Sequence, residues 1–203
     1  MKRLRLSAGT VFLLAATLLV SCGFLPDSRP EVLPSSGKCW LLEAKSYQFR
    51  QSIRLEWSGR VENFEAFTAL DLQSFKLRQV VFNQLGVTLL KLEIDCRDFS
   101  AAGPLSATFA GRRLTGLLVS AWRRIYLDLE AKESGMFVSR SGQRPEFTGQ
   151  PARLVSLKGS SGDIEFADFR RVGSLELPYK IVLRNRCPEY TLAVRLLTVE
   201  EGL

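Results

Sequence analysis

The chain has 203 residues, with 28 lysines and arginines, 21 acidic residues and no histidine. Without histidine there can be no Ser-His-Asp or Cys-His hydrolytic site, and a typical zinc site is not expected. The formal net charge of +7 is spread along the chain without a block of like charge, so nucleic-acid binding has little support.

Residues 1–21 have the pattern of a secretory signal peptide. Three basic residues in the opening MKRLR precede an apolar run from Val11 to Val20. That run is too short to span a bilayer, which takes about 20 apolar residues in a helix. Removing this segment leaves 25 basic and 21 acidic residues, so the net charge of the mature chain falls to +4.

The segment Ser21-Cys22-Gly23 resembles a bacterial lipobox. The resemblance implies cleavage before Cys22, with acyl chains such as palmitate on its sulfur and amine. Two or more chains anchor a protein stably. The alternative is an ordinary secretory signal cut near Ser21, which leaves a free thiol. In enterobacterial lipoproteins an aspartate after the cysteine favours the inner membrane. Gly23 therefore implies a lipid anchor in the outer membrane of a Gram-negative bacterium, facing the periplasm.

Residues 22–38 contain three prolines together with serine and glycine, and we predict an extended tether. The folded domain is expected over residues 39–203. Three cysteines remain there: Cys39, Cys96 and Cys187. In an oxidising periplasm one pair can form and one thiol is left over, and the sequence does not choose among the three pairings.

From about residue 47 the apolar residues recur with period two, which predicts β-strands. Ile53, Leu55 and Trp57 alternate with charged residues in the first segment. Further alternating segments follow up to residue 94, with a turn at residues 83–86. Four antiparallel strands in a meander are the simplest account.

The middle of the chain has helical periodicity. Leu114, Leu118 and Ile125 belong to one apolar stripe, and Arg123 and Arg124 lie off it. The stripe predicts a helix that either packs on the sheet as ordinary core or acts as a plug or lid over a cavity.

Strand patterns resume near residues 136–139 and 154–157 and end in two long segments, 177–185 and 189–199, joined by a turn at Cys187 and Pro188. The expected fold is mainly β (α+β): a curved antiparallel sheet that forms an incomplete barrel closed by a helical lid or plug.

The segment VVFNQLGVTLLKLEID, residues 80–95, resembles LolB, the outer-membrane lipoprotein receptor, and the wider LolA/LolB-like group. That group has an Asn-Pro-Leu-Gly turn between two strands, and Asn83-Gln84-Leu85-Gly86 stands at the matching place. The closing segment, residues 177–200, is similar to the family's final strand pair. The departure is Gln84 in place of proline, which leaves the turn less rigid. LolB-like lipoproteins of unassigned function are alternative relatives.

The resemblance implies an apolar cavity for acyl chains and a membrane-insertion loop carrying Leu85 and Gly86. From the residues alone, an exposed leucine at a hairpin tip is ordinary. The candidates for cavity lining are apolar residues of the predicted strands and helix, for which plain core packing is the alternative: Trp57, Leu70, Phe82, Leu90, Leu118, Trp122, Ile181 and Leu192.

Three functions are compared. The first is a carrier or receptor that binds acyl chains of lipoproteins, or another amphiphile, and assists their insertion into the outer membrane, with a periplasmic LolA-like carrier as a partner. The second is a structural or assembly lipoprotein with a filled core and a protein partner. The third is an enzyme using Asp95 and Asp98 as acid and base; such strand-edge acids are usually solvated, so no enzyme, cofactor or metal site is expected.

Overall fold

A computed structural model describes residues 46–131, 137–139, 142–149, 153–173 and 175–201. The predicted signal peptide, the lipidation site Cys22, the tether and Cys39 lie outside these residues. The strands and helices have the following bounds: β1 Ser46–Trp57, β2 Arg60–Asp71, β3 Lys76–Phe82, β4 Thr88–Ile94, β5 Phe99–Ala102, α1 Pro104–Ala107, α2 Phe109–Trp122, the π-helix η1 Arg123–Leu127, β6 Leu129–Ala131, β7 Phe137–Ser139, β8 Arg144–Thr148, β9 Arg153–Lys158, β10 Gly162–Val172, β11 Leu175–Arg186 and β12 Glu189–Glu201.

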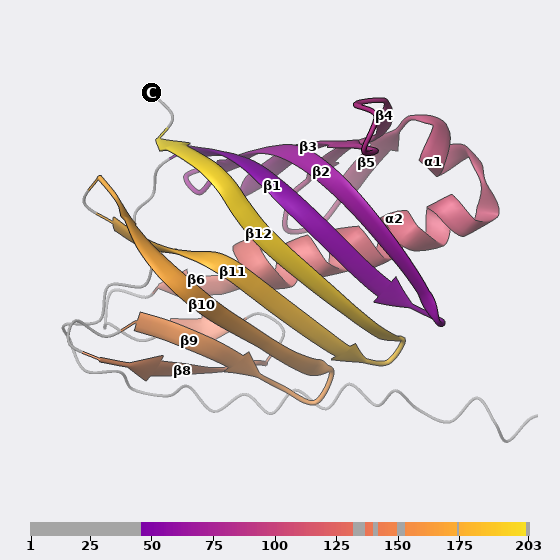
Figure 1. The fold of residues 1–203 in the computed structure, drawn as a ribbon. Helices are drawn as coiled ribbons and strands as arrows, with labels where there is room; N and C mark the ends of the chain where they lie inside the picture. Colours follow the sequence, from indigo (N-terminus) through magenta and orange to yellow (C-terminus); the bar gives the residue numbers. More distant parts are fainter. Residues whose placement is uncertain (1–45, 132–136, 140–141, 150–152, 174, 202–203) are drawn as a thin grey trace, which may run out of the picture.

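Ten of the strands form one antiparallel sheet in the order β5-β4-β3-β2-β1-β12-β11-β10-β9-β8. The first and last strands of the domain, β1 and β12, therefore lie side by side in the middle, and each half of the sheet runs outward from them as a meander. β6 and β7 form a separate two-stranded sheet. The ten-stranded sheet curves without closing, and α2 lies against one of its faces (Figure 1). The prediction of a mainly β fold with an unclosed sheet and a helix is confirmed.

The alternation of apolar and polar residues explains the strands. In β1 every second residue from Tyr47 to Leu55 is buried, and the residues between are exposed. The same alternation recurs in β3 and β4, in β2 from Phe64 onward, and in β12 from Tyr190 to Leu196. The face of the sheet that packs on the helix is called the inner face, and the opposite face is called the outer face. Within the described residues, no helix has both the length and the apolar character that crossing a bilayer requires.

Helix α2 begins at Thr108, whose hydroxyl accepts a hydrogen bond from the backbone N–H of Gly111 at 3.0 Å. Its buried residues include Leu114 and Leu118 of the predicted stripe, and Trp122 is buried beside them. The turn that follows is a π-helix, which places Arg124 differently from an α-helical continuation.

Candidate functional site

The inner face and helix α2 together form the apolar interior in which acyl chains were expected. Six of the eight candidate lining residues belong to this interior and are 0–1% exposed: Leu70, Leu90, Leu118, Trp122, Ile181 and Leu192. Trp57 is half-buried at the end of β1 and packs against the edge of the same cluster. These residues contact one another in one continuous core, so helix side chains occupy the inner face.

Phe82 does not belong to this set. In β3 the buried positions are Leu77, Gln79 and Val81, and Phe82 is on the opposite side of the strand. There its ring packs edge-on against Phe67 of β2, with the centroids 5.7 Å apart. Phe67 is 55% exposed, so this aromatic pair belongs to the outer face.

Polar side chains inside the core fix the position of the helix. The indole Nε1 of Trp122 donates to Gln79 Oε1 at 2.8 Å, and Gln79 Nε2 donates to the hydroxyl of Thr68 at 2.9 Å. Gln51 Nε2 donates to the same hydroxyl at 2.9 Å, and the hydroxyl of Tyr126 lies 3.5 Å from Gln51 Oε1. Buried polar groups are costly unless they are paired, so this chain of bonds selects one register of the helix on the sheet.

Stacked aromatic rings strengthen the same contact. The ring of Tyr126 lies 5.7 Å from that of Trp122 and 5.9 Å from that of Phe49 of β1. Burial raises the pKa of the Tyr126 hydroxyl above its ordinary value, because the phenolate would be desolvated. The helix is therefore attached to the middle of the sheet by both ring packing and hydrogen bonds.

Arg124 lies in the π-helix that follows α2, at one end of this interior. The sequence places it off the apolar stripe, but the π-turn buries it to 7% exposure. Its guanidinium donates to Asn185 Oδ1 at 2.6 Å and to the carbonyl of Gly162 at 3.0 Å. Desolvation lowers the pKa of Arg124, and the nearby Tyr190 and Asp128 oppose that shift. We call the contact of Arg124 with Asn185 and Gly162 the arginine latch.

The β3–β4 loop holds the predicted membrane-insertion residue at its tip. Leu85 is 87% exposed. The side-chain oxygen of Asn83 accepts hydrogen bonds from the backbone N–H groups of Leu85 and Val87 at 3.0 and 2.9 Å. Gly86 has φ +78, a conformation that favours glycine. Asn83 and Gly86 thus fix the turn, and they hold Leu85 away from the core.

Two neighbours of Leu85 were not singled out from the sequence. Val87 is 54% exposed and Val61 of β2 is 47% exposed. Val61 and Leu85 line the same shallow hollow of about 350 Å³ beside the loop. Val61 lies near the start of β2, and the antiparallel pairing of β2 with β3 brings that end of β2 beside the β3–β4 loop.

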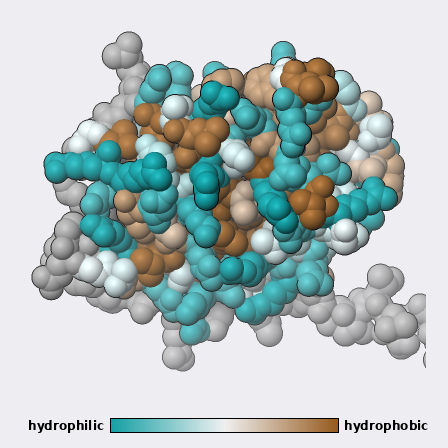
Figure 2. Space-filling view, in the orientation of Figure 1, coloured by the Kyte–Doolittle hydropathy of each residue, from teal (hydrophilic) through white to brown (hydrophobic). Residues whose placement is uncertain are grey.

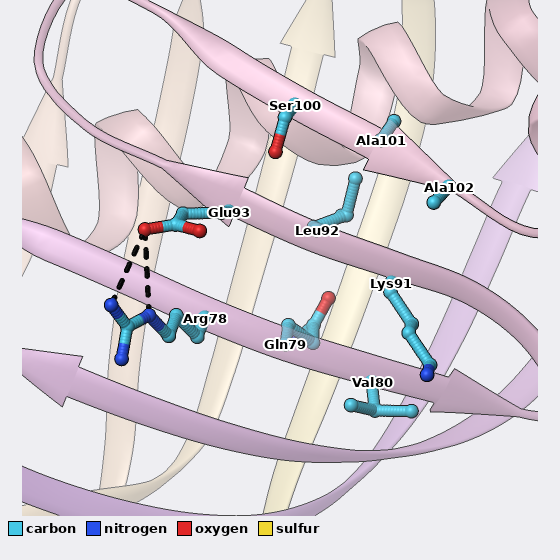
Figure 3. Close-up of a pocket in the computed structure, with 9 residues that line it drawn as sticks. All are labelled: Arg78, Gln79, Val80, Lys91, Leu92, Glu93, Ser100, Ala101 and Ala102. Atoms are coloured by element: carbon cyan, nitrogen blue, oxygen red, sulfur yellow. Dashed lines mark hydrogen bonds and ion pairs between the residues drawn. The ribbon is translucent and has the colours of Figure 1, made fainter.

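A second hollow, of about 290 Å³, lies where β3, β4 and the edge strand β5 meet (Figure 3). The side chains of β5 here, including Ser100 and Ala102, are too small to fill this hollow. The ion pair of Arg78 with Glu93, at 3.4 Å, lies at its rim. Its charged rim does not match an acyl chain.

The acids considered for catalysis have a local structural role. The Asp95 carboxylate accepts hydrogen bonds from the backbone N–H groups of Asp98 and Arg97, at 2.6 and 2.7 Å, and these lower its pKa. The carboxylate therefore fixes the turn between β4 and β5. Cys96 in this turn is a free thiol, whereas Cys187 is disulfide-bonded. One bonded cysteine and one free cysteine agree with the expectation of a single pair.

Comparison with known proteins finds similarity at the level of structure. No family model and no curated protein matches the sequence. The crystal structure of a DUF1329 family protein from Desulfovibrio piger matches with a TM-score of 0.53 at 6% identity, covering 80% of this chain and 88% of that one. The LolA superfamily protein NE2245 from Nitrosomonas europaea matches with a TM-score of 0.51 at 10% identity, with the same coverage. The chain therefore has a fold similar to that of LolA superfamily proteins.

Proposed function

We propose that this chain is a lipid-anchored protein of the outer membrane that binds acyl chains of lipoproteins between its sheet and helix α2 and assists their insertion into that membrane. The observation that carries the proposal is the inner face, an apolar surface on an unclosed sheet that helix α2 covers. The similarity to a LolA superfamily protein supports it. In this proposal residues 1–21 are the signal peptide, Cys22 carries the acyl chains, residues 22–38 are the tether, and a LolA-like carrier delivers the cargo.

The energetics allow an exchange between helix and acyl chain. Burying a chain of about 16 carbons contributes about 12 kcal/mol, at roughly 0.8 kcal/mol per CH₂. The helix side chains Leu114, Leu118 and Ile125, together with Trp122, bury comparable apolar surface, at about 1.5–3 kcal/mol each. These four side chains sum to about 6–12 kcal/mol, and the hydrogen bonds of Trp122 and Arg124 add to the cost of displacing the helix. The gain from the acyl chain is of the same order as this cost.

A test of uptake uses residues 23–203, which contain every described element. Replacing Trp40 and Trp57 by phenylalanine leaves Trp122 as the single tryptophan of the three. An acylated peptide with a nitroxide on its acyl chain should quench the fluorescence of Trp122, and native mass spectrometry should show a one-to-one complex. The same peptide without its acyl chain is the control. Failure of both readouts would contradict acyl-chain binding.

The loop is proposed to deliver the cargo to the bilayer. Leu85→Glu should keep uptake of the acylated peptide but lose its transfer to vesicles, since a carboxylate at the tip opposes entry into the apolar region. Gln84→Glu changes the charge by the same amount at the neighbouring exposed position and serves as the matched control. Equal transfer by both variants would argue against a membrane role for Leu85.

A structural or assembly lipoprotein is the second candidate. The observation in its favour is the filled inner face, held by the hydrogen bonds of Trp122 and Arg124. Under this alternative the core never opens, Trp122 is not quenched, and the chain acts through a protein partner in the cell envelope.

A further inference from the structure

Two cations oppose each other near the centre of the outer face. Lys180 of β11 and Arg195 of β12 are directly paired across the two strands, and both are exposed. Side chains at such positions start about 5 Å apart, and like charges there destabilise a sheet. Within the part of the chain that the structure describes, neither side chain makes an ion pair.

The acidic residues around these cations already have partners. Glu165 pairs with Arg184 at 2.7 Å on one side, and Glu65 pairs with Arg50 at 2.9 Å on the other. The cross-strand neighbours of the two cations in the same row are Ala167 of β10 and Ser52 of β1. Small, uncharged neighbours leave both cations accessible and without compensation.

Lys180 and Arg195 lie on the two strands next to the middle of the sheet. β12 and β11 are central strands of the ten-stranded order, and the sheet curves around α2, so they lie in the middle of its convex outer face (Figure 1). Leu197 stands at a bulge two residues after Arg195 and is 42% exposed. Figure 2 shows this face of the molecule, where apolar patches lie among hydrophilic side chains.

We propose that Lys180 and Arg195 form a docking surface for the anionic phospholipid headgroups of a membrane. This inference rests on the proposed function only in taking a membrane as the surface that the chain meets, and it does not require acyl-chain binding. Two adjacent cations attract negatively charged headgroups, each contributing about fivefold to the partition coefficient. Leu197 adds an apolar side chain that reaches the headgroup region.

The shape of the face favours a membrane over an acidic protein. A flat bilayer touches a convex face first at its central strands, whereas a protein partner would need a complementary concave surface. The row of Lys180 and Arg195 continues through Ser52 and Glu65 to Phe82, the residue before the β3–β4 loop. Four strand spacings separate its ends, or about 19 Å. One tilt of the molecule therefore brings both the cations and Leu85 to the same bilayer.

The test measures binding of residues 23–203 to vesicles of phosphatidylethanolamine and phosphatidylglycerol at low ionic strength. The double variant Lys180→Gln/Arg195→Gln should lower the partition coefficient about 25-fold. The matched control, Arg97→Gln/Arg113→Gln, removes the same charge from the β4–β5 turn and the exposed side of α2. It should change binding less than about threefold. Urea unfolding should show that the first variant is at least as stable as the wild type, because a like-charge pair is lost.

An equal effect of the two double variants would overturn the inference, because net charge alone would then explain binding. Wild-type protein that ignores anionic vesicles would also overturn it and would make an acidic protein the better candidate partner. Acyl-peptide uptake is measured on the same variants. If vesicle binding depends on Lys180 and Arg195 but no acyl peptide is taken up, the docking surface stands and the carrier function falls.

Discussion

The arginine latch gives the sharpest energetic prediction. Asn185→Leu removes the acceptor that lies 2.6 Å from the Arg124 guanidinium, and it also removes the donor that Asn185 Nδ2 supplies to the carbonyl of Pro188 at 2.7 Å. A hydrogen bond to a charged group contributes about 1.5–3 kcal/mol and a neutral one about 1 kcal/mol. The variant should therefore lose about 2.5–4 kcal/mol of the free energy of unfolding.

A double-mutant cycle separates the pair from its surroundings. Arg124→Met alone should lower the free energy of unfolding by about 2 kcal/mol. The buried oxygens of Asn185 and Gly162 lose their donor, but a charge no longer has to be buried. The double variant should be less destabilised than the sum of the two by about 1.5–3 kcal/mol, because neither partner is then left unpaired.

The assay is urea unfolding with a constant slope across the four proteins. The control cycle uses Arg184 of β11 and Glu165 of β10, which also form an ion pair but are 54% and 55% exposed. Its coupling should stay below about 1 kcal/mol. If the effects of the two single variants add to within about 0.5 kcal/mol, the hydrogen bond between Arg124 and Asn185 does not stabilise the packing of the helix on the sheet, and the reasoning is refuted.

Three further outcomes are expected. Burial raises the pKa of Tyr126, so the folded chain keeps a proton that the unfolded chain loses above about pH 10. The contribution of Tyr126 to the free energy of unfolding is therefore complete below about pH 10 and falls as the pH rises, by up to about 1.4 kcal/mol per pH unit. Tyr126→Phe should reduce this dependence of the free energy of unfolding on pH, measured by urea unfolding at a series of pH values. Gly116→Ala should raise the free energy of unfolding by about 0.5–1 kcal/mol, because nothing lies within 4 Å of the added methyl in the helix. Gly162→Ala, with φ +132 and a carbonyl oxygen 2.0 Å from the new Cβ, should instead lower it by at least about 3 kcal/mol. Leu85→Glu should change the free energy of unfolding by less than about 0.5 kcal/mol, since the side chain is 87% exposed; a larger loss would mean that the loop packs on the core.

Local patterns predicted most of the strands and the helix, because period-two and helical periodicities follow directly from which side chains are buried. Leu90, Leu92 and Ile94 are all at most 3% exposed, and the stripe of α2 faces the sheet. The neighbouring run Val80-Val81-Phe82 is apolar throughout, so it has no alternation from which a face could be assigned. Only the tertiary contacts place Phe82 outside.

The polar interior could not be predicted for a related reason. Gln51 and Gln79 occupy inner positions where a sequence reading expects apolar residues, and each is acceptable there only because partners arrive from elsewhere in the chain. Trp122 is 43 residues from Gln79. Likewise, the π-turn that buries Arg124 has no signature in the periodicity of α2, and the pair of Lys180 and Arg195 depends on the register of β11 with β12.

The latch and the proposed cargo site are thermodynamically linked if acyl chains replace the helix. A ligand that binds only the opened state has an apparent affinity reduced by the fraction of molecules in that state. Weakening the packed state of the helix through Asn185→Leu should then raise the affinity for an acylated peptide. Gly59→Ala, which strains the β1–β2 turn through its φ of +74 and touches no residue of the arginine latch, should lower stability without that gain. If the core stays filled, as in the assembly-lipoprotein alternative, both variants lose stability and neither binds the peptide. The comparison of these two variants therefore separates an interior that opens from one that only holds the sheet together.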